Sequence, residues 1–377
     1  MKTRSSFSVF LSAVPLACAL LIAGCATSPP APQAVVKPVF PSPPDEARFY
    51  YERSIYTSAD VVKEDKNAGL RRMLTGESRL GEGMGKPYGV AVYHGRLFVS
   101  DTAEKAVMVF DIPGEKFFKI GEDEPGRLMM PIGLDVDAKG DLYVVDATAK
   151  QVMVYDKDGR YLRSLGSGKY FSRPSGIAVD AEGARVYVVD TGSVTNDEHH
   201  VRVFDAKDGK HLLDIGKRGS AKGEFNLPRD VTIGQDGLIY VVDGGNFRVQ
   251  AFRPDGTFVR SFGEVGRRSG QFSRPKEAAV DPDGNIYVVD AAFGNFQIFN
   301  TQGQLLLPVG SRSEKDGPAK YMLPAGIAID ADGRVYVADQ FFRKVDVYRP
   351  AHLPETAGYA VKPAARAEAK PAVKAAQ

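Results

Sequence analysis

The stretch NIYVVDAAFGNFQIF, residues 285–299, contains two short apolar runs separated by a turn, and it decides the fold because near copies of it recur. LYVVDATAKQVMVY begins at residue 142, VYVVDTG at 186, IYVVDGGNFRVQAF at 239 and VYVADQFFRKVDVY at 335, with a weaker copy, LFVSDTAEKAVMVF, at 97. A repeat at a fixed period predicts a molecule assembled from equal structural units. The sequence therefore predicts six such units.

Two markers define the period of the repeat. The aspartate that closes the apolar run recurs every 44 to 53 residues, at Asp101, Asp146, Asp190, Asp243, Asp290 and Asp339. A proline follows the same period 14 to 16 residues upstream, at Pro87, Pro131, Pro174, Pro228, Pro275 and Pro324. Because two independent markers share one phase, the six units are well defined.

Each unit contains four apolar runs separated by turns. In the fifth unit the runs are EAAVD, NIYVVD, FQIF and QLLLPVG, and the intervening PDG and NTQG favour tight hairpin turns. Four antiparallel strands in forty-odd residues are typical of a propeller blade. The consecutive apolar positions of YVV indicate a strand buried on both faces. We predict an all-β fold, a six-bladed β-propeller of four-stranded antiparallel blades.

The last unit has no outer strand of its own, because the chain passes from KVDVYRP into its tail. Ahead of the first unit, residues 69–87 read GLRRMLTGESRLGEGMGKP, which matches an outer strand followed by a linker. We predict that residues 70–76 form the outermost strand of the sixth blade. This N-terminal strand closes the ring and removes the edges that an open ring exposes.

The fourth unit contains Asp243, Asn246, Arg248 and Val249 in the order Asp-x-x-Asn-x-Arg-Val, flanked by GSAKGEFNLP and GRRSGQFSRP. In these residues the chain resembles the NHL repeat family, over about residues 70–349. The resemblance implies a propeller in which the blade-to-blade linkers and the loops after the second strands share one face. The first two units lack the Asn and Arg of the motif.

The beginning of the chain predicts export and lipidation. Lys2 and Arg4 precede an apolar stretch over residues 7–22, which is too short for a transmembrane span. LIAGC, residues 21–25, resembles the bacterial lipobox, which implies cleavage before Cys25 and acylation, palmitate included, of that residue. Ala26 after the cysteine implies the outer membrane, with the protein facing the periplasm. An ordinary secretory signal is the alternative.

These features predict four segments. They are a lipoprotein signal peptide at 1–24, a Pro-rich lipid-anchored linker at 25–45, an NHL-type propeller at 46–350 and a disordered Ala/Lys/Pro tail at 351–377. Cys25 is the one cysteine beyond the signal peptide, so no disulfide is expected in the propeller.

The residues that follow the marker prolines suggest a binding site at the propeller axis. The residue two positions after the marker proline is glycine in four units, but it is Asp230 in the fourth unit and Glu277 in the fifth. The two acids are interpreted as metal ligands or substrate acceptors, or else as structural partners of Arg229, Lys276 or backbone amides. With Arg274 these five residues form a candidate ligand-binding set. The linkers that carry them are basic and would attract anions, the alternative being ordinary solvated charge.

The third unit has the longest loop after its YVVD, TGSVTNDEHHV. Long loops on a rigid scaffold often bind ligands, so Asp197, Glu198, His199 and His200 are also candidate ligand-binding residues. Imidazole and carboxylate suit zinc, but adjacent histidines chelate one ion poorly. A polar recognition loop is therefore preferred to a metal site. The six repeated aspartates are expected to accept backbone amides at the turns.

The function predicted is that of a non-catalytic cell-envelope lipoprotein, a monomer that presents one loop face to an envelope protein or an anionic glycan. The alternative is a metal-dependent hydrolase or lyase, resembling the lactonases or amidating lyases, with calcium or zinc at the axial mouth. None of the five histidines is placed to face the axis, and no nucleophile motif is present. No cofactor or catalytic residue is predicted. The formal charge of +2 and the export signal argue against a nucleic-acid partner.

Overall fold

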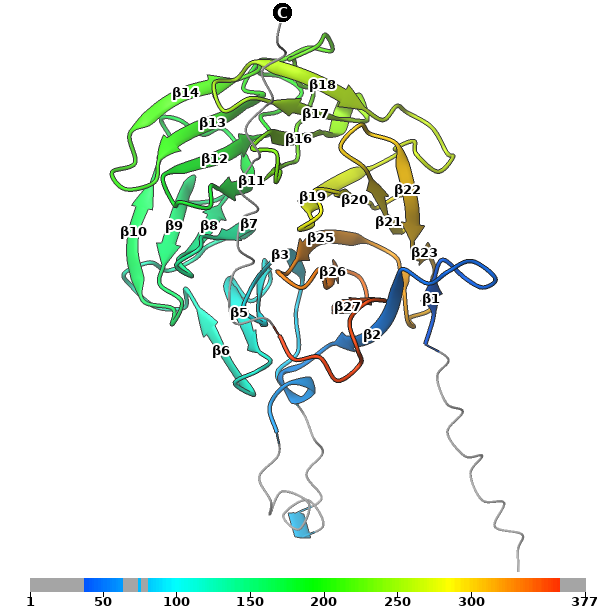
Figure 1. The fold of residues 1–377 in the computed structure, drawn as a ribbon. Helices are drawn as coiled ribbons and strands as arrows, with labels where there is room; N and C mark the ends of the chain where they lie inside the picture. Colours follow the sequence, from blue (N-terminus) through cyan, green and yellow to red (C-terminus); the bar gives the residue numbers. More distant parts are fainter. Residues whose placement is uncertain (1–36, 64–73, 76–80, 360–377) are drawn as a thin grey trace, which may run out of the picture. The chain divides into compact units, whose positions relative to one another are not determined.

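The computed structural model describes residues 37–63, 74–75 and 81–359. Over these residues the chain forms six antiparallel sheets arranged around one axis (Figure 1). This confirms the predicted six-bladed propeller of four-stranded blades. No helix in the described ranges is long and apolar enough to cross a membrane.

The first five blades follow one another along the chain, and in each the strand order is the chain order. Blade 1 contains β3 (Pro87–Tyr93), β4 (Arg96–Asp101), β5 (Ala106–Asp111) and β6 (Lys116–Ile120), and blade 2 contains β7 (Pro131–Val136), β8 (Leu142–Asp146), β9 (Gln151–Tyr155) and β10 (Tyr161–Leu165). Blade 3 contains β11 (Pro174–Val179), β12 (Arg185–Asp190), β13 (His200–Asp205) and β14 (His211–Ile215).

Blade 4 contains β15 (Asp230–Ile233), β16 (Ile239–Asp243), β17 (Arg248–Phe252) and β18 (Phe258–Phe262), and blade 5 contains β19 (Pro275–Val280), β20 (Ile286–Asp290), β21 (Asn295–Phe299) and β22 (Leu305–Val309). Short 3-10 turns occur at Ser58–Asp60 and Gly244–Asn246, and β23 (Ser311–Arg312) and β24 (Lys320–Tyr321) pair in the linker after blade 5. The first strand of each blade is innermost, and the marker prolines begin most of these strands (Figure 1).

The sixth blade joins the two ends of the propeller. It consists of β25 (Pro324–Ile329), β26 (Val335–Asp339) and β27 (Lys344–Pro350), followed in space by β2 (Phe49–Ile55) and β1 (Val39–Phe40). β2 pairs antiparallel with β27, from Phe49 opposite Pro350 to Ile55 opposite Val345. Closure of the ring by an N-terminal strand is therefore confirmed.

The prediction that residues 70–76 form this strand was wrong, because the strand that pairs with β27 is β2. FYYERSI suits this place because Phe49, Tyr51 and Ile55 are all buried there, and the Tyr51 ring packs edge-on against Tyr348 with 6.0 Å between centroids. Of residues 70–76, only Leu74 and Thr75 are described, and Leu74 is exposed.

Described residues on both sides of the range 46–350, predicted for the propeller, also have defined contacts. β1 lies within the segment expected to be a Pro-rich spacer. Residues 351–359, expected to be disordered, contact the propeller: the buried Arg334 donates to the Ala357 carbonyl at 2.9 Å, and its guanidinium lies 4.6 Å from the centre of the Tyr359 ring. Arg53 donates to the Tyr359 hydroxyl at 3.1 Å.

The hydrophobic core is divided among the seams between blades. Tyr143 and Val154 of blade 2, for example, share one buried cluster with Val188 and Phe204 of blade 3. Comparable clusters join the other neighbouring pairs, including blade 6 with blade 1. Each sheet thus buries both apolar faces because a neighbour lies against it.

The repeated aspartates hold the linker of each blade to its loops, as predicted. Asp290, which is fully buried, accepts the backbone N–H groups of Ser273 and Arg274 from the linker at 2.7 and 3.0 Å. The same carboxylate accepts those of Ala292 and Phe293 from its own loop at 2.9 and 3.1 Å. Asp101, Asp146 and Asp339 accept linker and loop amides in the same way.

Candidate anion-binding site at the axis

The innermost strands approach one another closely at the face where they begin, which we call the linker face because the blade-to-blade linkers lie there. A Cβ added to Gly133 would lie 2.3 Å from the Ser175 carbonyl oxygen of the next blade, and one on Gly326 would lie 2.4 Å from that of Tyr88. Only glycine fits such contacts without a shift of the backbone. This explains the glycine found in four of the six blades.

Asp230 and Glu277, which replace glycine in blades 4 and 5, are both buried. Asp230 Oδ2 accepts the N–H of Ala278 in the next blade at 2.9 Å, and Glu277 accepts that of Ile327. Asp135 makes the same connection from blade 2, accepting the N–H of Val179 at 2.8 Å. These acids bind backbone amides across the seams, which is one of the structural roles expected of the first two.

Burial in this position shifts the acids towards their neutral forms. It raises the pKa of Asp230 to about 7 and that of Asp135 to about 6. The pKa of Glu277 is raised well above its ordinary value, first by burial and then by the nearby charge of Asp230. The three side chains line an axial cavity of about 190 Å³. Asp135 was not predicted as a site residue, because it lies four residues after its marker proline rather than two.

Four cationic side chains gather above these acids at the linker face. Arg229 and Lys276 directly follow marker prolines and are half-buried, whereas Arg173 and Arg274 directly precede them and are exposed. The charges of Arg173 and Arg274 both act on Arg229, and those of Arg274 and Arg229 act on Lys276. The structure thus brings together all five residues predicted for the axis and adds Arg173.

Tyr88 of blade 1 completes this group from the other side of the axis. Its pKa is raised to about 12, first by burial and then by the charge of Glu277, while Arg229 and Arg173 oppose the shift. Burial also lowers the pKa of Arg229, and burial with the charges of Arg274 and Arg229 lowers that of Lys276 to about 8. Side chains from blades 1, 3, 4 and 5 therefore converge at one place.

The cations of this cluster lack close partners among the described residues. The side chains of Arg173, Arg229, Arg274 and Lys276 make no hydrogen bond or ion pair with any of them. Lys344 offers a contrast, since it is fully buried but pairs with Asp316 at 3.0 Å and Asp346 at 3.1 Å. Burial favours the neutral form of the acids, so they offset little of the positive charge of the unpaired cations above them. The site therefore has a positive potential. Such a site attracts anions, and the planar guanidinium groups favour carboxylate or phosphate.

The loop of blade 3 is built differently from the predicted recognition loop. His199 is fully buried: its Nε2 lies 2.9 Å from the Ser193 carbonyl oxygen, and the Leu227 N–H donates to its Nδ1 at 3.3 Å. His200 Nδ1 lies 3.1 Å from the Gly216 carbonyl oxygen. The two histidines thus support the loop through backbone contacts.

The two acids of this loop form ion pairs. Glu198 pairs with Arg202, and the exposed Asp197 lies 3.4 Å from Arg218. The structure does not bring these four loop residues into the axial cluster. Within the described ranges, no three His, Cys, Asp or Glu side chains gather so as to hold a metal ion.

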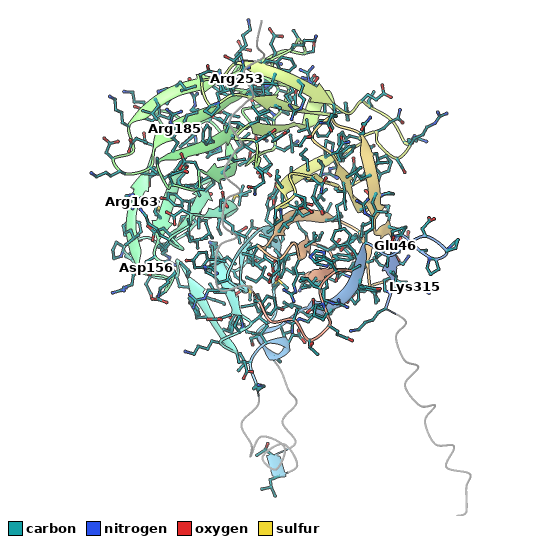
Figure 2. The ribbon with its side chains drawn as sticks, in the orientation of Figure 1. Glu46, Asp156, Arg163, Arg185, Arg253 and Lys315 are labelled. Carbon is teal, nitrogen blue, oxygen red and sulfur yellow. The ribbon has the colours of Figure 1, made fainter. Side chains whose placement is uncertain are left out.

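A hollow at the opposite end of the axis was not predicted from the sequence. It has a volume of about 640 Å³ and is lined by the hairpin turns after the innermost strands, including Asp137 and Asp330. Asp137 accepts the N–H groups of Lys139 and Asp141, and Asp330 those of Asp332 and Arg334. These acids are engaged in shaping the turns. Figure 2 shows Asp156 and Arg163 at the outer rim of the ring.

Comparison with known proteins identifies the repeat. A family model described as NHL repeat matches residues 225–252, and one described as 6-bladed beta-propeller matches residues 82–165. In the first match, the Asn246 side chain and Arg248 Nε donate to Asp243 Oδ2 at 2.8 and 2.9 Å, and Arg248 also donates to two linker carbonyls. The motif residues therefore connect loop and linker.

Among curated proteins, the chain is 29% identical over 107 residues to a probable peptidyl-alpha-hydroxyglycine alpha-amidating lyase of Caenorhabditis elegans. That alignment covers 27% of this chain and 29% of the relative, so it spans under a third of either. Similar solved structures include a protein of unknown function from Bacteroides thetaiotaomicron, with 16% identity, a TM-score of 0.58 and coverage of 81% of this chain and 76% of that one.

A gluconolactonase from Xanthomonas campestris is also similar, with 16% identity and a TM-score of 0.55, covering 80% of this chain and 98% of that one. At such identities the likeness concerns the fold alone. Residues 225–252 thus match an NHL repeat, residues 82–165 match a 6-bladed beta-propeller, and the described residues form six blades closed into a ring.

Proposed function

We propose that this protein is a binding protein of the bacterial cell envelope that holds an anionic ligand at the linker face of its axis. The proposal includes the predicted lipid on Cys25, which would attach the propeller to the outer membrane on the periplasmic side. The ligand is an anionic group of an envelope glycan or of a partner protein. The propeller acts as a monomer and needs no cofactor for this role.

The observation that supports the proposal best is the unpaired cation cluster. Folding places Arg229 and Lys276 in a half-buried position without a carboxylate partner among the described residues. Partial burial of a charge is unfavourable unless something compensates for it. A bound anion would supply that compensation. Fully exposed cations, such as those of the linkers at the rim, are solvated by water and would not need such compensation.

Calorimetric titration tests the proposal, with inorganic phosphate and polygalacturonate as probes at low ionic strength. Arg229→Met should weaken binding at least tenfold, since a hydrogen bond to a charged group contributes roughly 1.5–3 kcal/mol. Lys207→Met is the matched control, because Lys207 is exposed on the hairpin turn between β13 and β14 at the opposite face. Equal affinities for the wild type and both variants, or no binding by the wild type, would refute the proposal.

A second candidate function is that of a propeller hydrolase or lyase. It is favoured by the similarity to the amidating lyase over 107 residues, and by Asp230 and Glu277, whose raised pKa values suit proton transfer. Metal analysis of the purified protein separates the two candidates. Stoichiometric calcium or zinc that is lost in Asp230→Ala would favour the enzyme, whereas anion binding without bound metal would favour the binding protein.

A further inference from the structure

We propose that the Nζ amine of Lys276 forms a reversible imine with small anionic carbonyl compounds, namely 2-oxo acids and aldehydes that carry a carboxylate or phosphate. The inference rests on the proposed anion site and deepens it, because it assigns a chemical class of ligand to that site.

The first support is the placement of the amine. Lys276 lies at the start of the innermost strand β19 and is half-buried, beside the guanidinium groups of Arg229 and Arg274. Its Nζ makes no hydrogen bond or ion pair with a described residue. Other lysines with little exposure do have partners: Lys344 pairs with Asp346 at 3.1 Å, and Lys119 pairs with Glu104 at 3.0 Å. Lys276 is therefore a partly dehydrated amine without an ion-pair partner among the described residues, and the nearby charge of Glu277 only partly offsets the effect of burial and of the two guanidinium groups on its pKa.

The second support is the protonation state that this placement produces. Burial and the two guanidinium charges lower the pKa of Lys276 to about 8. At pH 7 about a tenth of the molecules then carry the free amine, a few hundred times more than for an ordinary lysine. A free amine in such surroundings is the form that adds to carbonyl groups.

The third support is the arrangement of the neighbours. Arg229 and Arg274 can bind the carboxylate or phosphate of the ligand, which positions a nearby carbonyl carbon for attack by Nζ. The nitrogen lone pair forms the C–N bond, and the carbonyl oxygen takes one N–H proton to give a carbinolamine. Loss of the hydroxyl with the second N–H proton releases water and leaves the C=N bond. The step is redox-neutral and needs no co-reactant.

Reductive trapping tests the inference, with pyridoxal 5′-phosphate or glyoxylate as probe, sodium cyanoborohydride as reductant and peptide mass mapping as readout. Lys276 should be modified at least tenfold faster than Lys207, the exposed lysine of the opposite face. Excess inorganic phosphate should slow the modification of Lys276 but not that of Lys207. Lys276→Arg should remove the adduct from this peptide, and Arg229→Met should slow its formation at least fivefold.

Two results would overturn the inference. One is modification of Lys276 no faster than that of Lys207. The other is a rate unaffected by phosphate and by Arg229→Met, which would mean that the amine reacts without an anion site. The proposed function is judged separately, by titration of the wild type with phosphate, which has no carbonyl group. Phosphate binding without trapping refutes the imine alone, and absence of phosphate binding refutes the anion site itself.

Discussion

Replacement of Asp230 by Asn should stabilise the protein at pH 8, although it removes an ionisable carboxyl group from the middle of the candidate site. Burial raises the pKa of Asp230 from its ordinary 3.8 to about 7. Between these values the folded protein keeps a proton that the unfolded chain has released, so the free energy of unfolding falls as the pH rises from about 4 to about 7. Each pH unit is worth about 1.4 kcal/mol, which gives a loss on the order of 4 kcal/mol above pH 7.

Asparagine escapes this loss because it does not ionise, and its side-chain oxygen can still accept the Ala278 N–H that Asp230 accepts at 2.9 Å. Urea denaturation at pH 5 and pH 8 measures the effect as the difference between variant and wild type, so that titrating groups that do not interact with Asp230 cancel. We expect the variant to gain about 3 kcal/mol on the wild type between these two pH values.

Asp283→Asn, in an exposed hairpin turn, is the matched control and should gain nothing. A stability difference between Asp230→Asn and the wild type that stays constant from pH 5 to pH 8 would refute the reasoning. The expected gain also bears on function, because a residue that lowers stability at neutral pH is typical of a functional site.

Three further predictions concern the scaffold and its anchor. Asp290→Ala should lower the free energy of unfolding by about 4 kcal/mol in urea denaturation, because four amide donors lose their acceptor. The control Asp283→Ala should change the free energy of unfolding by less than about 0.5 kcal/mol. A loss under about 1 kcal/mol in Asp290→Ala would contradict the prediction. Gly133→Ala should lower the thermal midpoint by several degrees, since its Cβ would meet a carbonyl oxygen at 2.3 Å; an unchanged midpoint would show that the axis is less crowded than described. In cells fed a clickable palmitate analogue, the wild type should be labelled and Cys25→Ser should not; equal labelling would place the lipid elsewhere.

The architecture was predictable because it depends on a repeat. Aspartate and proline markers in one phase, with four apolar runs between them, determine the number of blades and the strands in each. The closing strand was not predictable in the same way, because it belongs to no repeat and is specified by its fit against β27. The buried residues of FYYERSI are Phe49, Tyr51 and Ile55, a pattern that many half-buried strands share. The sequence therefore does not indicate which N-terminal segment pairs with the last blade.

The candidate site was predictable to the extent that it follows the same register. Asp230 and Glu277 were identified because they interrupt a row of glycines, Arg229 and Lys276 because they directly precede these acids, and Arg274 because it belongs to a basic linker. Arg173 has the same relation to Pro174 as Arg274 has to Pro275, so the register could have identified it too. Tyr88 has the same position after Pro87 as Arg229 has after Pro228, but a glycine rather than an acid follows it, so only the structure reveals its role. Asp135 has no such signal, because its role depends on which groups meet across the seam between blades.

The blade 3 loop shows the opposite outcome. Two histidines beside two acids suggested ligand binding, and only three-dimensional packing reveals that His199 is buried against backbone groups. The hollow at the other end of the axis was also outside the reach of the sequence. Its volume depends on how far the turns of neighbouring blades stand apart, which no local pattern specifies.

The most direct test of the anion site is a crystal soaked in selenate, whose anomalous scattering locates the ion without reference to the protein phases. The structure predicts a selenate within hydrogen-bond distance of Arg229 and Lys276, and its loss from crystals of Arg229→Met. Strong selenate peaks elsewhere on the protein, with none near these two side chains, would contradict the proposal that the unpaired cations at the axis form a binding site.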